Sequence, residues 1–159
     1  MVEGEGSNGD TEKGAVPSII GDISRPAAMS SVPELVEFVS SVERKEGFSE
    51  GRIDEVEMAV REALTTIIQA TAGGQSGDIT ITCRHDHWGK LMVTIEDRGE
   101  AFNILLADIV FQGEKDPVDE KRRASARLIK KMIDNIEQKR VDATNVLTFV
   151  VSPTLRAKH

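Results

Sequence analysis

The longest periodic segment of the sequence runs from about Glu50 to Ala72 and predicts an amphipathic helix. Apolar side chains recur three or four residues apart along one stripe: Ile53, Val56, Val60, Ala63 and Ile67. The opposite side carries polar residues: Glu55, Glu62, Thr66 and Gln69. Gly73 and Gly74 follow directly and predict the end of the helix. Because a helix of this kind must bury its apolar stripe, the chain needs a second structural layer.

Two further elements are predicted ahead of this helix. The run from Val16 to Ile23 is apolar but interrupted by Pro17 and Gly21, which favours an edge strand. From Ser31 to Lys45, helical spacing relates six apolar residues: Val32, Leu35, Val36, Phe38, Val39 and Val42. Ser31 is the expected N-cap and Glu34 its capping-box partner. Gly47 would end this helix.

Strand periodicity follows the long helix. Asp78 to Arg84 and Lys90 to Glu96 alternate apolar and polar residues, and the short connection His85 to Gly89 predicts a hairpin between them. The sequence Asp97-Arg98-Gly99 then ends the second strand.

The last third of the chain mixes helical and strand signals. We expect a short helix from Phe102 to Phe111, a loop from Gln112 to Glu120 and a last strand from Val146 to Val151. An amphipathic helix between them is marked by Leu128, Ile129, Met132, Ile133 and Ile136. The order of elements predicts an α+β fold, a two-layer α/β sandwich with helices on one face of a mostly antiparallel sheet.

The composition limits the possible domain organisation and the possible binding partners. Residues 1–14 are nearly free of large apolar side chains and predict a disordered tail, whereas residues 15–155 are long enough for one domain. A formal charge of -7 argues against direct nucleic-acid binding. No apolar run would span a membrane, and the single cysteine, Cys83, cannot form an internal disulfide. We therefore expect a cytoplasmic protein.

Three segments, in order, resemble one known family. They are Val60-Arg61-Glu62-Ala63-Leu64-Thr65-Thr66-Ile67-Ile68, Ile95-Glu96-Asp97-Arg98-Gly99-Glu100-Ala101-Phe102 and Leu128-Ile129-Lys130-Lys131-Met132-Ile133-Asp134. Together they resemble the bacterial anti-sigma-factor serine kinases, which have the histidine-kinase-type (GHKL) ATPase fold. The resemblance extends over nearly the whole chain after the tail.

The first segment implies a catalytic base and a metal ligand. Glu62 matches the family's general base, whereas the family's magnesium-binding asparagine is replaced by Thr66. A hydroxyl is a poorer ligand than an amide carbonyl for Mg2+, which requires hard oxygens in octahedral positions. The plain alternative is that both residues belong to the polar face of a helix.

The second segment implies recognition of adenine. Asp97, Gly99 and Phe102 match the family's D-x-G-x-x-F element, in which the aspartate accepts a hydrogen bond from the adenine amino group. Glycine permits a close backbone approach. Taken by itself, the same pattern is also typical of an ordinary Asp-x-Gly turn.

The third segment should place two glycines before a helix, where backbone N–H groups bind phosphate. Arg123 and Ser125 occupy those two positions, and their side chains should crowd the phosphates. Arg123, with Lys121, Arg122 and Arg127 nearby, could instead supply positive charge to phosphate. A solvated basic helix face is the alternative.

One constellation is independent of the family. If the strand continued through the turn, Cys83, His85 and His87 would share one face and could contribute to a zinc site. No fourth ligand is evident, and solvated turn histidines are the alternative that we favour.

These observations support three hypotheses for function. The first is an anti-sigma-factor-like regulator that binds a sigma factor, its STAS-type antagonist protein, or both, with weak or lost ATP binding. The second is an active protein-serine kinase that uses ATP and Mg2+ to phosphorylate the antagonist. The third, a histidine-kinase sensor fragment, ranks last because no helix with a phosphoacceptor histidine precedes the domain. Homodimerisation is implied by the resemblance alone.

Overall fold

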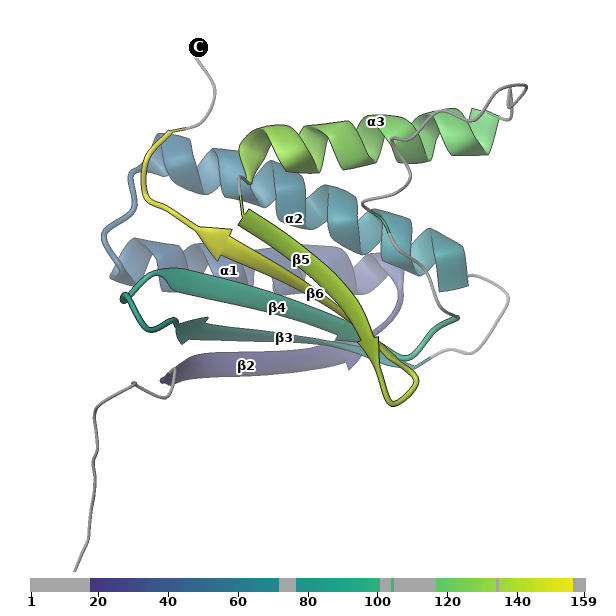
Figure 1. Ribbon diagram of the computed structural model, residues 1–159, viewed down its shortest axis with the longest axis horizontal. Helices are drawn as coiled ribbons and strands as arrows, with labels where there is room; N and C mark the ends of the chain where they lie inside the picture. Colours follow the sequence, from purple (N-terminus) through teal and green to yellow (C-terminus); the bar gives the residue numbers. More distant parts are fainter. Residues whose placement is uncertain (1–17, 72–76, 101–103, 105–116, 134, 156–159) are drawn as a thin grey trace, which may run out of the picture.

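The sheet and helices form two layers in the computed structural model, which describes residues 18–71, 77–100, 104, 117–133 and 135–155 (Figure 1). The elements are, in order, β2 (Ile19–Pro26), a 3-10 turn η1 (Met29–Ser31), α1 (Val32–Lys45), α2 (Glu50–Thr71), β3 (Asp78–His85), β4 (Leu91–Asp97), α3 (Pro117–Met132), β5 (Asn135–Val141) and β6 (Thr144–Val151). The five strands pair in the order β2-β3-β4-β6-β5, and every pair is antiparallel.

The three helices lie together on one face of this sheet (Figure 1). Strand residues that point toward the helices are apolar and buried: Ile79, Ile81, Val93, Ile95, Leu147 and Phe149. Alternate residues such as Thr80 and Glu96 lie on the other face, because successive side chains of a strand point to opposite sides. The predicted two-layer α+β architecture is therefore confirmed.

The helix α2 begins at the predicted residue and continues to Thr71, after which the predicted end, Ala72, lies outside the described residues. All five residues of its apolar stripe are at most 5% exposed. The apolar periodicity was sufficient here because one stripe of the helix faces a single continuous core.

The start of α1 differs from the expectation. Ser31 is the N-cap residue, but it makes no side-chain capping hydrogen bond. Its backbone is helical because it continues the preceding 3-10 turn, whereas a capping serine normally has an extended backbone. Glu34 accepts a hydrogen bond from Nη2 of Arg25 at 2.7 Å. The predicted capping box is therefore wrong.

The hairpin between β3 and β4 is confirmed, and β2 lies at one edge of the sheet formed by the described strands, as expected, although it begins at Ile19. Val16 and Pro17 lie outside the described residues, as does the predicted tail. Asp86 closes the hairpin turn, since its Oδ1 accepts hydrogen bonds from the backbone N–H groups of Trp88 and Lys90, both at 2.8 Å. Gly89 supplies the positive φ of 80° that the turn requires.

The second half of the chain contains the main errors of the sequence analysis. Ile136 lies in β5 and not in a helix, because α3 already ends at Met132. The predicted loop up to Glu120 is wrong from Pro117 onward, where α3 begins. Except for Ile104, the predicted helix Phe102 to Phe111 lies outside the described residues. None of the described helices is long and apolar enough to cross a membrane.

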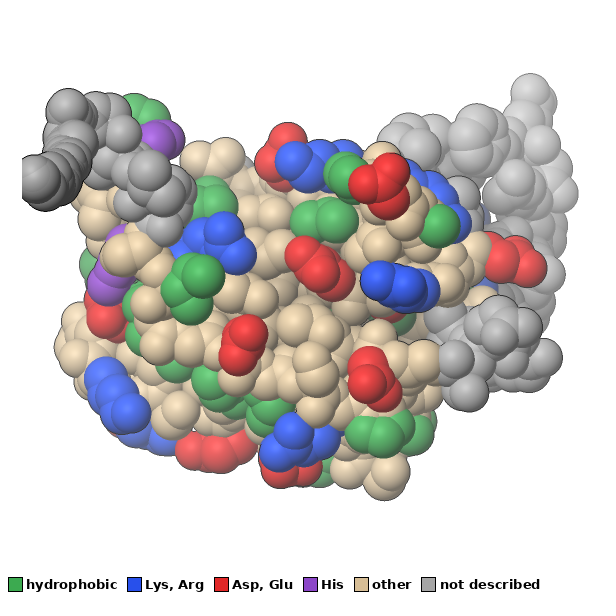
Figure 2. All heavy atoms as spheres, turned by 90° about the horizontal axis from the view of Figure 1, so that it is seen from below, with side chains coloured by type: hydrophobic (Ala, Val, Ile, Leu, Met, Phe, Trp, Pro, Cys, Tyr) green, Lys and Arg blue, Asp and Glu red, His purple; other side chains and the backbone are tan. Residues whose placement is uncertain are grey.

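Charges of both signs are interspersed on the side of the molecule seen in Figure 2, which looks from below Figure 1, where β2 lies. Apolar side chains form small separate groups on this face. The described part of this face therefore carries no continuous basic stripe of the kind that tracks a nucleic-acid backbone.

Candidate functional site

The residues singled out by the family resemblance come from α2, α3 and the end of β4. The C-terminal end of α2, the N-terminal end of α3 and the end of β4 lie on the same side of the molecule (Figure 1). Glu62 and Thr66 belong to α2, Asp97 ends β4, and Arg123 and Ser125 lie near the middle of α3. Phe102 lies outside the described residues.

Glu62 and Ser125 are in direct contact across the two helices. The Ser125 hydroxyl donates a hydrogen bond to Oε1 of Glu62 at 2.6 Å. Ser125 is buried, and Glu62 is half-buried. A short O–H to carboxylate bond of this kind is stronger than one between neutral groups. The Glu62 carboxylate, the expected catalytic base, is therefore held by Ser125, at one of the two positions where the resemblance implies a glycine.

Thr66 uses its hydroxyl within its own helix. Its Oγ1 donates to the backbone carbonyl of Glu62 at 2.8 Å, and the residue is 4% exposed. Threonines in helix interiors commonly form this bond to the carbonyl four residues earlier. The hydroxyl is thus directed along the helix backbone, and a Mg2+ ion would lack the amide oxygen that the family motif supplies at this position.

Arg123 and Ser125 both lie inside α3, more than one turn after its first residue, Pro117. Only the first four N–H groups of a helix are free of partners within the helix, so the N–H groups of these two residues are used internally. The Arg123 side chain is buried, and its Nη2 donates to Oε1 of Glu120 at 3.3 Å. Lys121 and Arg127 are exposed, as expected for a solvated face.

Asp97 sits in a buried network at the end of β4. Within the described residues, its carboxylate accepts two hydrogen bonds, both on Oδ2, from the Gly99 backbone N–H at 3.0 Å and from Asn145 Nδ2 at 3.2 Å. Asp97 and Asn145 are each 5% exposed. Oδ1 is thus left to accept from an exocyclic amine, and a buried acceptor of fixed orientation suits that task.

Two residues that the sequence analysis did not identify hold this segment. Asn145 Nδ2 also donates to the Glu100 carbonyl at 2.9 Å. Arg140 Nη1 donates to the Gly99 carbonyl at 3.0 Å and to Oδ1 of Asn145 at 2.9 Å. An asparagine among the apolar inward-facing positions of the strand Thr144–Val151 was the available signal, because Leu147, Phe149 and Val151 occupy the other positions of that face.

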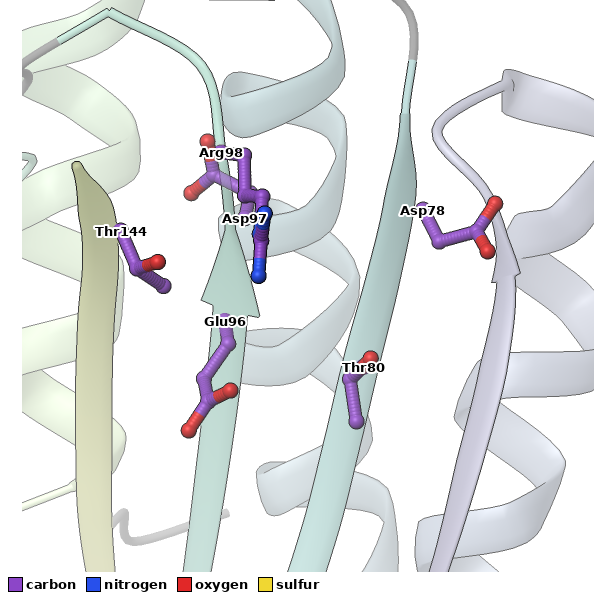
Figure 3. Close-up of a pocket in the computed structure, with 6 residues that line it drawn as sticks. All are labelled: Asp78, Thr80, Glu96, Asp97, Arg98 and Thr144. Carbon is purple, nitrogen blue, oxygen red and sulfur yellow. The ribbon is translucent and has the colours of Figure 1, made fainter. Parts of the chain in front are cut away.

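A pocket of about 300 Å3 lies beside this network, lined by Asp78, Thr80, Glu96, Asp97, Arg98 and Thr144. Figure 3 shows Thr80 and Glu96 on the side of the sheet away from the helices. Three carboxylates against one arginine give this pocket an acidic lining. The pocket shares Asp97 with the candidate site but lies on the opposite face from Glu62 and Ser125, and its charge does not suit a polyphosphate.

The proposed zinc ligands are not brought together. Cys83 faces the core, and burial raises the pKa of its thiol to about 12. His85 Nε2 lies 2.7 Å from Oε1 of Glu46, whereas His87 lies in the turn and packs edge-on against Trp88. No group of three or more His, Cys, Asp or Glu in the described ranges could hold a metal ion.

Comparison with known proteins agrees with the fold. Residues 25–151 match the family described as the histidine kinase-like ATPase domain. The fold is similar to that of a chain in the crystal structure of the SiaB-SiaC complex from Pseudomonas aeruginosa, with a TM-score of 0.56 and 12% sequence identity. The alignment covers 84% of this chain and 90% of that chain. No curated protein matches this chain in sequence.

Proposed function

Since the chain belongs to the histidine kinase-like ATPase domain family, we propose that it is a regulator that acts by binding protein partners, with ATP binding weak or lost. The observation that carries the proposal is the hydrogen bond between Ser125 and Glu62. It joins the base position to a position where the family motif has a glycine. The residues present therefore do not fit the phosphate and magnesium side of the nucleotide.

Two physical consequences support weak phosphate binding. Phosphate sites at helix N-termini use N–H groups that have no partner within the helix, but Arg123 and Ser125 lie beyond those groups in α3. The Arg123 side chain is 7% exposed and its guanidinium is paired with Glu120, so it offers little free positive charge. A triphosphate would have to break both arrangements in order to bind.

The partners proposed are a sigma factor and a STAS-type antagonist protein, as in an anti-sigma factor. The family resemblance supports this assignment, and the similar solved structure is a complex of two named proteins, SiaB and SiaC. We also propose a homodimer and a cytoplasmic location on the same resemblance. The acidic net charge is compatible with protein partners that present basic or mixed surfaces.

An active serine kinase is the second candidate, and the Asp97 network favours it. Oδ2 of Asp97 is held by Gly99 and Asn145, which leaves an oriented acceptor for adenine. Glu62 would then serve as the base that removes the proton of the acceptor hydroxyl. For that role, Glu62 must first release the Ser125 hydroxyl.

Calorimetric titration with Mg-ATP separates the two candidates. We expect no detectable heat at millimolar nucleotide, whereas clear micromolar binding would refute the proposed loss of ATP binding. The variant Thr66→Asn/Arg123→Gly/Ser125→Gly should bind Mg-ATP more tightly than the wild type. Its matched control is Ala124→Gly/Lys131→Gly, which places two glycines at exposed positions of the same helix and carries a similar helix penalty.

Partner binding is tested separately with purified sigma factors and STAS-domain proteins from the source genome. Complex formation without nucleotide, measured by the same calorimetry, is the expected result. Binding to none of these proteins would refute the regulatory assignment even if ATP binding is absent. Transfer of phosphate to a STAS-domain protein, followed with labelled ATP, would establish the kinase.

A further inference from the structure

Glu43, in the last turns of α1, is a fully buried carboxyl group away from the candidate site. It is 0% exposed, and neither of its oxygens has a hydrogen-bond partner among the described residues. An ionised carboxylate in such a position would lose its hydration without compensation, whereas the neutral acid loses much less. The geometry therefore favours a bound proton on this side chain.

A buried arginine lies at the same junction. Arg52 is 0% exposed and donates from Nε to the Ser152 carbonyl at 2.8 Å, and from Nη1 to the Met132 carbonyl and to Oε1 of Glu55, both at 2.9 Å. Nη2 of Arg52 has no partner among the described residues. One side chain thus ties the start of α2 to the end of α3 and to the residue after β6. Figure 1 shows these ends, with the end of α1, on the same side of the molecule.

The charges around Glu43 come from two helices, α1 and α2. Burial is the largest effect and raises the pKa of Glu43 to about 8. Arg52 on α2 and Arg44 on α1 lower this pKa, and Glu57 on α2 raises it. The Cys83 thiol on β3 also interacts with Glu43, and it stays protonated because burial raises its pKa. The attraction to Arg52 is therefore present but too weak to overcome the loss of hydration.

We propose that Glu43 is a proton-controlled switch of this junction. While Glu43 keeps its proton, Arg52 keeps its hydrogen bonds to the Glu55 carboxylate and to the carbonyls of Met132 and Ser152. When the proton is lost to solvent, the new carboxylate attracts the free Nη2 of Arg52. A guanidinium has a rigid planar fork, so a shift of Nη2 toward Glu43 also moves Nε and Nη1. The bonds to Ser152 and Met132 then weaken.

This switch acts on a helix that also carries part of the candidate site. The carbonyl of Met132 is at the C-terminal end of α3, and Ser125, two turns earlier, holds Glu62. A change in the position of the C-terminal end of α3 is thus transmitted along this one helix to Ser125 in the candidate site. The inference does not depend on which of the two proposed functions is correct, because it rests on Glu43 and Arg52 alone.

The test combines two measurements on the full chain between pH 6 and 9.5. Carbon-13 NMR of the side-chain carboxyls should show Glu43 titrating with a midpoint near pH 8. Hydrogen exchange, corrected for the intrinsic rate at each pH, should show a severalfold loss of protection at Ile133 and Thr154 across the same range. Glu43→Gln should abolish the second effect, and Glu37→Gln, an exposed change on the same helix, should retain it.

Either of two results would overturn the proposal. One is a Glu43 carboxyl that titrates near the ordinary value of a glutamate. The other is a titration near pH 8 without any change in the protection of the α3 end. Because the wild-type titration decides the first point, the test stands even if Glu43→Gln folds poorly, and Glu43→Leu is a second variant without the carboxyl.

Discussion

Replacing Glu43 by glutamine keeps the size of the side chain and removes its ability to ionise. The native protein binds a proton at this residue up to about pH 8, whereas the unfolded chain releases it near pH 4.5. Between these two values the native state holds one more proton than the unfolded state. The free energy of unfolding therefore falls as the pH rises through this window, opposite to the usual behaviour of a carboxylate in an ion pair.

The magnitude follows from the two pKa values. Each pH unit between them corresponds to about 1.4 kcal/mol. Holding this proton while the unfolded chain is ionised therefore costs the fold about 3 kcal/mol at pH 7, and the cost levels off at about 5 kcal/mol above pH 8, where native Glu43 also ionises. Below pH 4.5 both states are protonated, and this residue contributes no pH dependence.

Urea unfolding of the wild type and Glu43→Gln at pH 5, 6, 7 and 8 measures this contribution. We expect the difference in unfolding free energy between the two proteins to change by about 3 kcal/mol from pH 5 to 7, in favour of the variant. Glu37→Gln, at an exposed position of α1, should give a curve parallel to that of the wild type. If the Glu43→Gln curve is also parallel, the carboxyl is not held in the neutral form, and the reasoning is refuted.

Three further predictions concern other parts of the fold. Arg52→Met should lower the unfolding free energy, measured by urea unfolding, by about 3–5 kcal/mol, because it leaves the buried Glu55 carboxylate without its arginine. The double variant Arg52→Met/Glu55→Leu should recover part of this loss. Phe149→Ala removes a fully buried ring and should cost about 3–5 kcal/mol with an unchanged m value. Asp86→Ala removes the acceptor of two turn N–H groups and should cost about 1 kcal/mol. Because Trp88 is the single tryptophan, lower fluorescence anisotropy should report the loosened turn, and unchanged anisotropy would argue against this role of Asp86.

The helices with a strong apolar stripe and the central hairpin could be predicted because their signals are local. In α2, residues three or four apart share one face, so the stripe of apolar residues coincides with the buried side. In β3 and β4, alternation has the same effect with a period of two. The spacing of its apolar residues therefore predicts which side of a helix or strand is buried.

The edge strand β5 escaped prediction for a physical reason. Its sequence is mostly polar, because an edge strand with one exposed face needs little apolar surface, and charged residues there discourage pairing with other chains. Its single isoleucine, Ile136, also continues the helical spacing of Ile129 and Ile133. Only the pairing of β5 with β6 shows that Ile136 belongs to a strand and not to a continuation of the helix.

The candidate site could likewise be predicted only in part. The residue types at Glu62, Asp97 and Gly99 could be read from the sequence, as could the departures from the family pattern that the resemblance implies at Thr66, Arg123 and Ser125. Their contacts were not, since Ser125 meets Glu62 across 63 residues of chain, and Arg140 and Asn145 reach the segment after β4 from the β5–β6 hairpin.

By itself, the sequence determined the two-layer α+β class, the α2 stripe and the residue types at the candidate site, because apolar spacing and side-chain chemistry are local properties. The tertiary structure was needed to show that Ser125 holds Glu62, and that Arg52 binds carbonyls 80 and 100 residues away. It also shows that the Glu43 carboxyl has no hydrogen-bond partner among the described residues. Such contacts depend on how separate elements pack, and no local spacing encodes the distance between two side chains on different helices.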